Sequence, residues 1–387
     1  MMRLNLRRLG LLLVLFSALP GVGNLAAAQA QAPPPVYRNL VMEGGGIRGI
    51  AYGGALAELE RQGQLRELRR VGGTSAGAIQ AALLAVGYAP AAIIGIVNEL
   101  PIQRLNDGQY IFFGGGRRLL KQYGWYRGDA FTELLAGLVA RQTQRPNLTL
   151  GELHALAVAQ PSRYRDLYTT GTNLTRQCAQ VFSYETHPNL RVADAVRISM
   201  SIPLYFRAVL LDAATGQVVA RPAPGQAVEV LVDGGLLANY PLDLFDHPRY
   251  LSSPRASEAA VSSSVVSSNY VSKKDDTRLD DTNPDGTFRN PETLGLRLDR
   301  PEQVGLDTQP GGRPRLAPYL IQDLGSYIGA LYTVALENLN PTHSSDWPRT
   351  VSISTVGFNP KIKRLTTDQK QQLMDSGRNG VREFLAR

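Results

Sequence analysis

Cysteine is almost absent from this chain of 387 residues, in which Cys178 is the single example. One thiol cannot form a disulfide within the chain, and its position excludes a bacterial lipoprotein anchor at an N-terminal cleavage site. Histidine is also rare, with four examples that are spread along the chain. Because no histidine–cysteine cluster has the spacing of metal ligands, we expect no metal site.

Strong charge of one sign is lacking as well. The formal net charge is +8 and 19% of the residues are charged, without a long run of lysine or arginine. Nucleic-acid binding therefore has little support. A mild basic excess suits an anionic membrane surface. Beyond the N-terminal region, no apolar segment approaches the length of a transmembrane helix.

The first 30 residues have the pattern of a secretory signal peptide. Three arginines among the first eight residues precede an apolar run at 9–16, and a cleavage site of A-x-A form ends at Ala30. The alternative is an N-terminal membrane anchor, but this run is short for a span and Pro20 follows it closely. We therefore expect export, either to a periplasm or to the outside of the cell.

Apolar strand-like segments alternate with helix-like segments through most of the chain. This alternation favours an α/β fold, with a mostly parallel sheet covered on both faces in a three-layer α/β/α arrangement. The serine-rich segment at about 251–290 breaks the pattern, and we interpret it as a flexible insertion in a single domain of residues 31–387. The expected strands are 37–43, 68–71, 167–171, 180–184, 228–232, 294–298 and 351–356, with a hairpin of 208–211 and 217–220. The expected helices are 50–61, 76–87, 91–100, 129–142, 150–159, 192–200, 317–339 and 366–385.

Two glycine-rich turns near the start of the chain each follow a predicted strand and open a predicted helix. The second, Gly73-Thr74-Ser75-Ala76-Gly77, matches the G-x-S-x-G nucleophile elbow, in which small residues allow the serine a sharp, strained turn. The first, Gly44-Gly45-Gly46-Ile47-Arg48-Gly49, supplies backbone N–H groups where an oxyanion would need donors. Together the two turns predict a serine acyl hydrolase.

Each turn also has another interpretation. Ser75 could simply cap the helix that begins at Ala76. The Gly44–Gly49 turn also fits the dinucleotide-binding fingerprint, which requires an acidic residue at the end of the second strand to hold the ribose. The predicted second strand ends instead in Val71-Gly72-Gly73, and export makes a nicotinamide cofactor less suitable. We therefore favour the oxyanion interpretation and expect no cofactor.

Ser75 needs a base to accept its proton. A serine–histidine–acid triad would have to use His154, His187, His247 or His343, and no motif surrounds any of them, although His343 has the late position that α/β-hydrolases use. Asp233 ends a predicted strand and is followed by Gly234 and Gly235. A turn aspartate is the plainer interpretation of Asp-Gly. All three glycine-flanked motifs end predicted strands, however, where ligands bind in parallel sheets.

The three motifs, in this order, resemble those of the patatin-like phospholipase family. The resemblance extends from about Leu40 to Leu242 and includes Ile202-Pro203 and Asn239-Tyr240-Pro241. Glycine loops of the family often begin with aspartate, and we expect Glu43 at this position to have little effect. The resemblance does not explain the serine-rich insertion.

The resemblance implies a serine–aspartate dyad, with Ser75 as nucleophile and Asp233 as general base. The implied oxyanion donors are the N–H groups of Gly45, Gly46 and Ile47. Arg48 would either steady the loop or meet a substrate phosphate, unless it is an ordinary surface residue. The residues that support the motifs are Gly44, Arg48, Gly49, Gly73, Gly77, Gly234 and Gly235.

The sequence thus predicts an exported lipid acyl hydrolase that cleaves phospholipids, lysophospholipids or glycerides at a membrane surface. A serine esterase with a histidine triad and a non-catalytic surface or interaction protein remain as alternatives. Residues 110–127 combine aromatic and basic side chains. They are interpreted either as a lipid-facing flap or as a helix whose aromatic side packs on the core.

Overall fold

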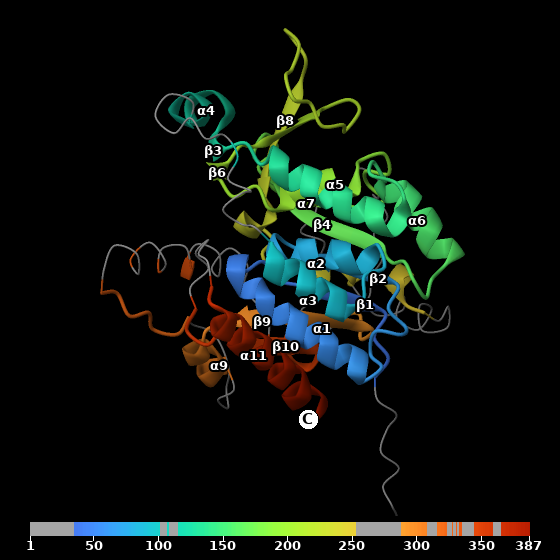
Figure 1. Ribbon diagram of the computed structural model, residues 1–387, viewed down its shortest axis with the longest axis vertical. Coiled ribbons are helices and arrows are strands. Elements are labelled where there is room, and N and C mark those ends of the chain that lie inside the picture. Colours follow the sequence, from blue (N-terminus) through green and yellow to red (C-terminus); the bar gives the residue numbers. More distant parts are fainter. Residues whose placement is uncertain are drawn as a thin grey trace, which may run out of the picture. The chain divides into compact units, whose positions relative to one another are not determined.

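A largely parallel sheet organises the part of the chain that the structure describes (Figure 1). This computed structural model describes residues 35–100, 107, 115–252, 288–307, 316–322, 327, 330, 333–334, 344–358 and 365–387. Across the sheet, the order is β10 (Thr350–Ser354), β9 (Thr293–Asp299), β1 (Asn39–Met42), β2 (Arg70–Gly73), β4 (Asp166–Asn173), β8 (Val228–Asp233) and β7 (Val209–Asp212), and β5 (Cys178–Phe182) also pairs with β4. A separate small sheet pairs β3 (Gly124–Tyr126) with β6 (Leu204–Phe206).

The strands from β10 to β4 run parallel to one another, whereas β5, β8 and β7 join antiparallel. The mixed α/β fold that the sequence predicts is therefore confirmed, with a largely parallel sheet and an antiparallel part on one side. One expectation needs correction in detail. The sequence pattern places Asp233 at the end of a strand, but β8 runs against β4 rather than with it.

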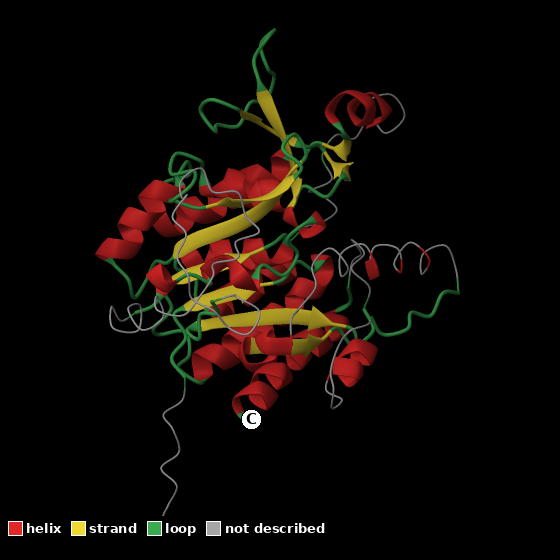
Figure 2. Ribbon diagram, turned by 180° about the vertical axis from the view of Figure 1, so that it is seen from behind, coloured by secondary structure: helices red, strands yellow, loops and turns green. Residues whose placement is uncertain are grey.

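Both faces of the sheet are covered, as a parallel sheet requires. Leu40 and Met42 of β1 join the large core beneath the helices, whereas Val41 between them packs into a second cluster on the other face. In Figure 1 the main helices lie in front of the sheet. In Figure 2, which is the view from behind, the strands lie in front of these helices. The helices are α1 (Ala51–Arg61), α2 (Ala76–Ala85), α3 (Pro90–Glu99), α4 (Gly115–Gln122), α5 (Asp129–Thr143), α6 (Leu150–Ala159), α7 (Val192–Ser199), α9 (Pro301–Asp307) and α11 (Thr367–Leu385).

Short 3₁₀ turns cover the other face of the sheet. Leu242, Leu244 and Phe245 of η3 (Leu242–Phe245) and Tyr250 of η4 (Pro248–Tyr250) pack on Val41 and Tyr168. Edge-on contacts of the Tyr168 ring with Phe245 and Tyr250, at 4.9 and 6.2 Å between centroids, lock these turns onto β4. The other short turns are η1 (Gly46–Ile50), η2 (Gly234–Leu236) and η5 (Ser344–Arg349).

Two strands meet end to end along one edge of β4. Strand β5 pairs with β4 from Thr169 to Asn173, so it occupies one edge of that stretch. The opposite edge is shared, because β2 pairs with β4 up to Thr169 and β8 pairs from Gly171 onward in the other direction. The carboxyl end of β2 therefore faces the carboxyl end of β8. Gly73, the last residue of β2, pairs with Thr169 of β4, and Asp233, the last residue of β8, pairs with Gly171. These two positions on β4 are about 7 Å apart along the strand.

Two expected elements are wrong in part. Residues 217–220 do not form the second strand of a hairpin; they contribute an isolated bridge from Val218 to Leu211, and β7 pairs with β8 instead. Pro222 and Pro224 follow, and prolines cannot donate to a strand ladder. In the region of the expected helix 317–339, the described residues 316–322 lack regular structure, whereas residues 327, 330 and 333–334 are helical as expected. Arg300 donates to the carbonyl groups of Ala317 and Pro318, which fixes the chain outside a helix.

Other expectations lie outside the described residues. These are the signal peptide of residues 1–30, most of the insertion at 251–290, residues 110–113 of the aromatic segment, and His343. Val36–Arg387 forms one compact unit, and Met1–Pro35 is assigned to a separate one. The division into a signal peptide and a single domain with an insertion stays a prediction.

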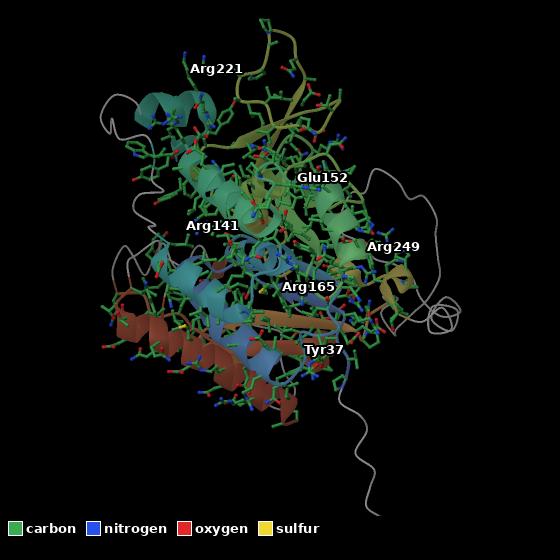
Figure 3. All side chains as sticks on the ribbon, turned by 45° about the vertical axis from the view of Figure 1, so that its right-hand side comes forward. Tyr37, Arg141, Glu152, Arg165, Arg221 and Arg249 are labelled. Carbon is green, nitrogen blue, oxygen red and sulfur yellow. The ribbon has the colours of Figure 1, made fainter. Side chains whose placement is uncertain are left out.

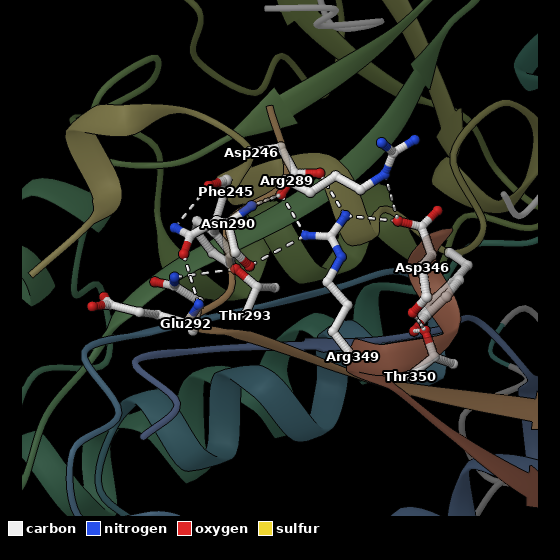
Figure 4. Close-up of polar contacts among 11 residues, drawn as sticks. Phe245, Asp246, Arg289, Asn290, Glu292, Thr293, Asp346, Arg349 and Thr350 are labelled. Atoms are coloured by element: carbon white, nitrogen blue, oxygen red, sulfur yellow. Dashed lines mark hydrogen bonds and ion pairs between the residues drawn. The ribbon is translucent and has the colours of Figure 1, made fainter. Parts of the chain in front are cut away.

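Ion pairs fix the chain on both sides of residues 253–287 (Figure 4). The Arg349 guanidinium donates to Asp246 at 2.6 Å and to Asp346 at 2.8 Å. Asn290 joins the same group, since its N–H donates to the Asp246 carboxylate at 3.0 Å. The Ser252 N–H donates to the Glu292 carboxylate at 3.0 Å. Residues before and after the insertion are thus held against each other by groups of the domain itself.

The terminal helix α11 lies against α1 at a distance that only glycine permits. A Cβ atom on Gly377 would lie 2.0 Å from the carbonyl oxygen of Ala51, and one on Gly54 would lie 1.8 Å from that of Met374. Both obstacles are backbone atoms in helices, so neither can move without displacing its helix. In contrast, a Cβ on Gly137 in α5 would meet nothing within 4 Å.

We expect Gly377→Ala to lower the free energy of unfolding by about 1–3 kcal/mol, because the added methyl group overpacks the α1–α11 contact. The matched variant Gly137→Ala should raise it by about 0.4–1 kcal/mol, since alanine reduces the freedom of the unfolded chain. Urea unfolding followed by circular dichroism measures both. Equal effects of the two substitutions would contradict the packing described here.

Candidate active site

Ser75 lies on a strained turn between β2 and α2. Its backbone has φ of 51° and ψ of −115°, a conformation that costs a non-glycine residue about 1–3 kcal/mol. The Ser75 N–H is fixed by a 3.0 Å hydrogen bond to the hydroxyl of Ser199, at the end of α7. Ser75 is half-buried, at the N-terminus of α2, where the helix dipole favours negative charge. This is the geometry that the G-x-S-x-G pattern predicts.

The flanking glycines bring α2 close to β1. A Cβ on Gly77 would lie 2.2 Å from the carbonyl oxygen of Met42, and one on Gly73 would lie 2.7 Å from the same atom. Thr74 holds the turn from the other side. Its hydroxyl donates to the carbonyl of Ala238 at 2.6 Å and lies 2.5 Å from the hydroxyl of Thr170 on β4. The turn is therefore held by both strands that flank β2.

Asp233 ends β8 and faces Ser75 across the gap between the two strands. Its side chain is buried, and this desolvation raises the pKa of its carboxyl group to about 7. Two hydrogen bonds act in the opposite direction and lower the pKa, one from the N–H of Gly235 and one from the Ser75 side chain. The Gly235 N–H lies 2.7 Å from the carboxylate oxygen. The two side chains that the sequence selects are thus in contact.

The glycine loop carries three N–H groups that point to no other acceptor. Within the described part of the chain, the N–H groups of Gly45, Gly46 and Ile47 have no hydrogen-bond partner. The N–H of Gly44 is already used, because it donates to the carbonyl of Asn239 at 3.0 Å. Gly46 has φ of 55°, and Gly46 and Ile47 line the same cavity as Ser75. Arg48 folds back on the loop, and its Nε donates to the carbonyl of Gly45 at 3.2 Å.

Glu43 and Asn239 support this loop, which the sequence pattern did not predict. The Glu43 carboxylate accepts hydrogen bonds from the Leu298 N–H at 2.7 Å and from the Asn239 side chain at 3.0 Å. A Cβ on Gly44 would lie 2.4 Å from the Asn239 side-chain oxygen. Glu43 thus ties the loop to β9 and to Asn239, and the expectation that glutamate in place of the family's aspartate has little effect stays a prediction.

An apolar cavity of about 120 Å³ opens beside Ser75. Helices α2, α3 and α5 and the segment after α7 provide its walls. Apart from Gln80 and Ser75, the side chains that line it are apolar. Its largest members are Ile47, Ile50, Ile79, Val97, Leu100, Phe131, Met200, Ile202 and Phe206. A hydrocarbon chain attached to a carbonyl group at Ser75 matches this lining.

The described histidines lie elsewhere and have other partners. His154 contacts Asp166 at 2.8 Å, at the start of β4 and far along the sheet from Ser75. His187 lies 3.2 Å from the Gln180 side chain, and His247 accepts from the N–H of Arg249. None of the three lines the cavity beside Ser75.

Two features are absent from the described residues. No group of three or more histidine, cysteine, aspartate or glutamate side chains could hold a metal ion there. No helix in that part of the chain is long and apolar enough to cross a membrane.

A hydroxyl on a strained turn, a carboxyl group with a pKa near neutrality, N–H groups unused within the described residues and an apolar cavity together form an arrangement that can support acyl transfer. Comparison with known proteins agrees with this class. The family model of patatin-like phospholipases matches residues 40–246, more than half of the chain. The chain belongs to the patatin-like phospholipase family, and lipid hydrolysis is the general activity that this family supports.

Two relatives and one structure illustrate the similarity. The uncharacterized protein YqhO of Bacillus subtilis is 34% identical over 226 residues, covering 55% of this chain and 68% of that protein. A probable lipid hydrolase, 463L of Invertebrate iridescent virus 6, is 22% identical over 220 residues, covering 54% of this chain and 64% of that protein. The crystal structure of VipD from Legionella pneumophila aligns with a TM-score of 0.54 at 17% identity, covering 91% of this chain and 67% of that chain. The last similarity concerns the fold alone.

Burial of Asp233 predicts a pH-dependent stability. Because its folded pKa of about 7 exceeds the unfolded value of about 3.9, the folded protein holds a proton that the unfolded chain releases between these values. The stabilisation is complete below about pH 4 and is lost as the pH rises through 7. We therefore expect Asp233→Asn to raise the melting temperature relative to wild type, increasingly from about pH 4 to pH 8.

Asp212→Asn is the matched control, because hydrogen bonds, chiefly that from Gln226, lower the pKa of Asp212 to about 2. The difference between this variant and wild type should not grow over the same pH range. A constant difference for Asp233→Asn as well, measured by calorimetry, would contradict a raised pKa at Asp233.

Proposed function

We propose that this protein hydrolyses acyl ester bonds of phospholipids, lysophospholipids or glycerides through an acyl-Ser75 intermediate. The observation that carries the proposal is the contact between the Ser75 hydroxyl and the buried Asp233 carboxylate. A carboxylate with a pKa near 7 is a much better base at neutral pH than an ordinary aspartate. The probable lipid hydrolase among the relatives supports the same class of substrate.

In the proposed mechanism, Ser75 Oγ attacks the ester carbonyl carbon while Asp233 accepts the hydroxyl proton. The carbonyl oxygen becomes an oxyanion. When the tetrahedral intermediate collapses, the bond to the alcohol breaks and the alcohol leaves with the proton from Asp233. Asp233 then removes a proton from water, whose oxygen attacks the acyl-serine. Collapse of the second intermediate releases the fatty acid and returns the proton to Ser75.

The oxyanion would be held by the N–H groups of Gly45 and Gly46, with Ile47 beside them. These donors are unused within the described residues, so they can bind a developing charge without first breaking another hydrogen bond. Removing one donor of this kind costs about 10²–10³ in rate. Arg48 would steady the loop through its bond to Gly45, which favours this role over binding of a substrate phosphate.

Ser75→Ala and Asp233→Asn should each lower kcat for a p-nitrophenyl ester by at least about 10⁴-fold, since one removes the nucleophile and the other the base. Only Asp233→Asn should still react with a fluorophosphonate probe, more slowly than wild type. His247→Ala and His343→Ala serve as controls and should keep full activity. Loss of activity in either histidine variant, with the fold intact, would favour a histidine triad. Absence of probe labelling in wild type would favour a non-catalytic scaffold.

The pH profile tests the proposed base directly. Because Asp233 must be ionised to accept the proton, kcat/KM should fall about tenfold per pH unit below its pKa of about 7 and level off above it. Initial-rate assays with a soluble ester between about pH 5 and pH 9 give this profile. A rate independent of pH across this range would argue against Asp233 as the base.

A further inference from the structure

Three large apolar residues in the described part of the chain combine positive φ with exposure to solvent. Val356, in the turn after β10, has φ of 50° and is 44% exposed, and the other two lie near each other. Tyr123 has φ of 62° and is 54% exposed, and Leu204 has φ of 66° and is 68% exposed. Residues of this kind seldom adopt positive φ, at a cost of about 1–3 kcal/mol each. Burial of the side chain does not explain either case. Such strain, where it is observed, points to a role outside folding.

The two residues lie side by side. Leu204 is the first residue of β6 and pairs with Gly124, which follows Tyr123 at the start of β3. Leu120 of α4 lies three residues before Tyr123 and is 82% exposed. We name Leu120, Tyr123 and Leu204 the apolar patch. Of the aromatic segment singled out in the sequence, Tyr126 instead packs inward on Tyr205, with 4.8 Å between ring centroids.

One residue of the apolar patch lies in a segment that also lines the cavity beside Ser75. Ile202 and Phe206 line that cavity, and Leu204 lies between them in the chain. The same short segment therefore presents two side chains to the cavity and one to solvent. A molecule that covers the patch would lie next to a wall of the proposed acyl-binding cavity.

Cations adjoin the apolar patch on the side of a second, larger cavity. This cavity, of about 660 Å³, is lined by Tyr123 together with Lys121 and Arg221. Figure 3 shows Arg221 at the end of the molecule that carries α4. Both cations are exposed, and neither has a hydrogen-bond or ion-pair partner among the described residues. The charged residues that line this cavity are five cations, Lys121, Arg191, Arg197, Arg207 and Arg221, and three carboxylates, Asp129, Glu133 and Asp194.

We propose that the apolar patch seats the protein on an anionic phospholipid bilayer, with Lys121 and Arg221 facing lipid phosphates. This inference rests on the proposed function, because it supplies the surface from which an acyl chain would enter the cavity. Apolar side chains beside exposed cations complement a membrane interface, where hydrocarbon lies beneath anionic headgroups. Tyr123 and Leu204 combine exposure to solvent with the backbone strain of positive φ.

The test is flotation of the full-length protein with vesicles, in a Ser75→Ala background that prevents hydrolysis. The double variant Tyr123→Asn/Leu204→Asn places asparagine, which tolerates positive φ, at both positions. It should weaken binding to phosphatidylglycerol-containing vesicles more than about tenfold. Leu120→Gln, on an exposed helix position, should weaken it about tenfold. Lys121→Gln/Arg221→Gln should weaken binding to these vesicles, by about fivefold for each charge, but not to pure phosphatidylcholine vesicles.

Val158→Gln is the matched control, because Val158 is 68% exposed on α6 and lies outside the patch. It should bind vesicles like the parent. With Ser75 restored, all of these variants should hydrolyse a soluble short-chain ester at the wild-type rate. If the double asparagine variant also loses soluble-ester hydrolysis, its fold is damaged, and Leu120→Gln alone decides.

Three results would overturn the proposal. The first two are no binding of the parent to anionic vesicles and equal binding by the patch variants and Val158→Gln. A dimer in solution that the patch variants disrupt would also overturn it, by assigning the patch to a second copy of the chain. Failure of the proposed function looks different. In that case wild type would not hydrolyse the soluble ester, while vesicle binding would still depend on the patch.

Discussion

The candidate site depends on one arrangement, in which β2 and β8 approach each other end to end along the same edge of β4. Parallel strands alone would place Ser75 and Asp233 at the ends of separate strands. Because β8 runs antiparallel, its last residue is instead carried toward the turn that follows β2. The result is a carboxylate that is buried and touches a hydroxyl, with desolvation raising its pKa to about 7. Geometry and basicity therefore come from the same feature of the sheet.

This arrangement is costly, and the surrounding contacts hold it in place. Asp233 is desolvated and Ser75 has positive φ, so both would relax if the surroundings were loose. Thr74 and Thr170 tie the serine turn to β4, while Glu43 and Asn239 tie the glycine loop to β9 and to the segment after β8. These bonds fix the loop that carries the unused N–H groups. Rigid donors of this kind are what stabilisation of a developing charge requires.

Local patterns in the sequence predict much of the fold. The helix expected at 150–159 coincides with α6, and the turns at Gly44–Gly49 and Gly73–Gly77 follow strands as expected. Long-range pairing could not be predicted, because nothing near Asp233 encodes the direction of β8. The pairing of β3 with β6 was missed for the same reason, since each strand has three residues and their partners are far apart in the chain.

The site shows the same division between local and distant information. Glycine spacing identified Ser75, Asp233 and the glycine loop. In the structure Ser75 lies beside Asp233, and Gly46 and Ile47 line the same cavity as Ser75. Ser199, Asn239 and the apolar lining carry no motif, because their contribution is a single contact made across the fold. The catalytic roles, the oxyanion donors and export stay predictions.

A crystal structure of the adduct formed with a long-chain alkyl fluorophosphonate tests the central claim most directly. The account predicts phosphorus bonded to Ser75 Oγ, a phosphonyl oxygen within hydrogen-bond distance of the Gly45 and Gly46 N–H groups, and the alkyl chain between Phe131 and Phe206. Asp233 should remain beside the modified serine. An adduct whose oxygen points away from the glycine loop, or a Ser75 separated from Asp233, would contradict it.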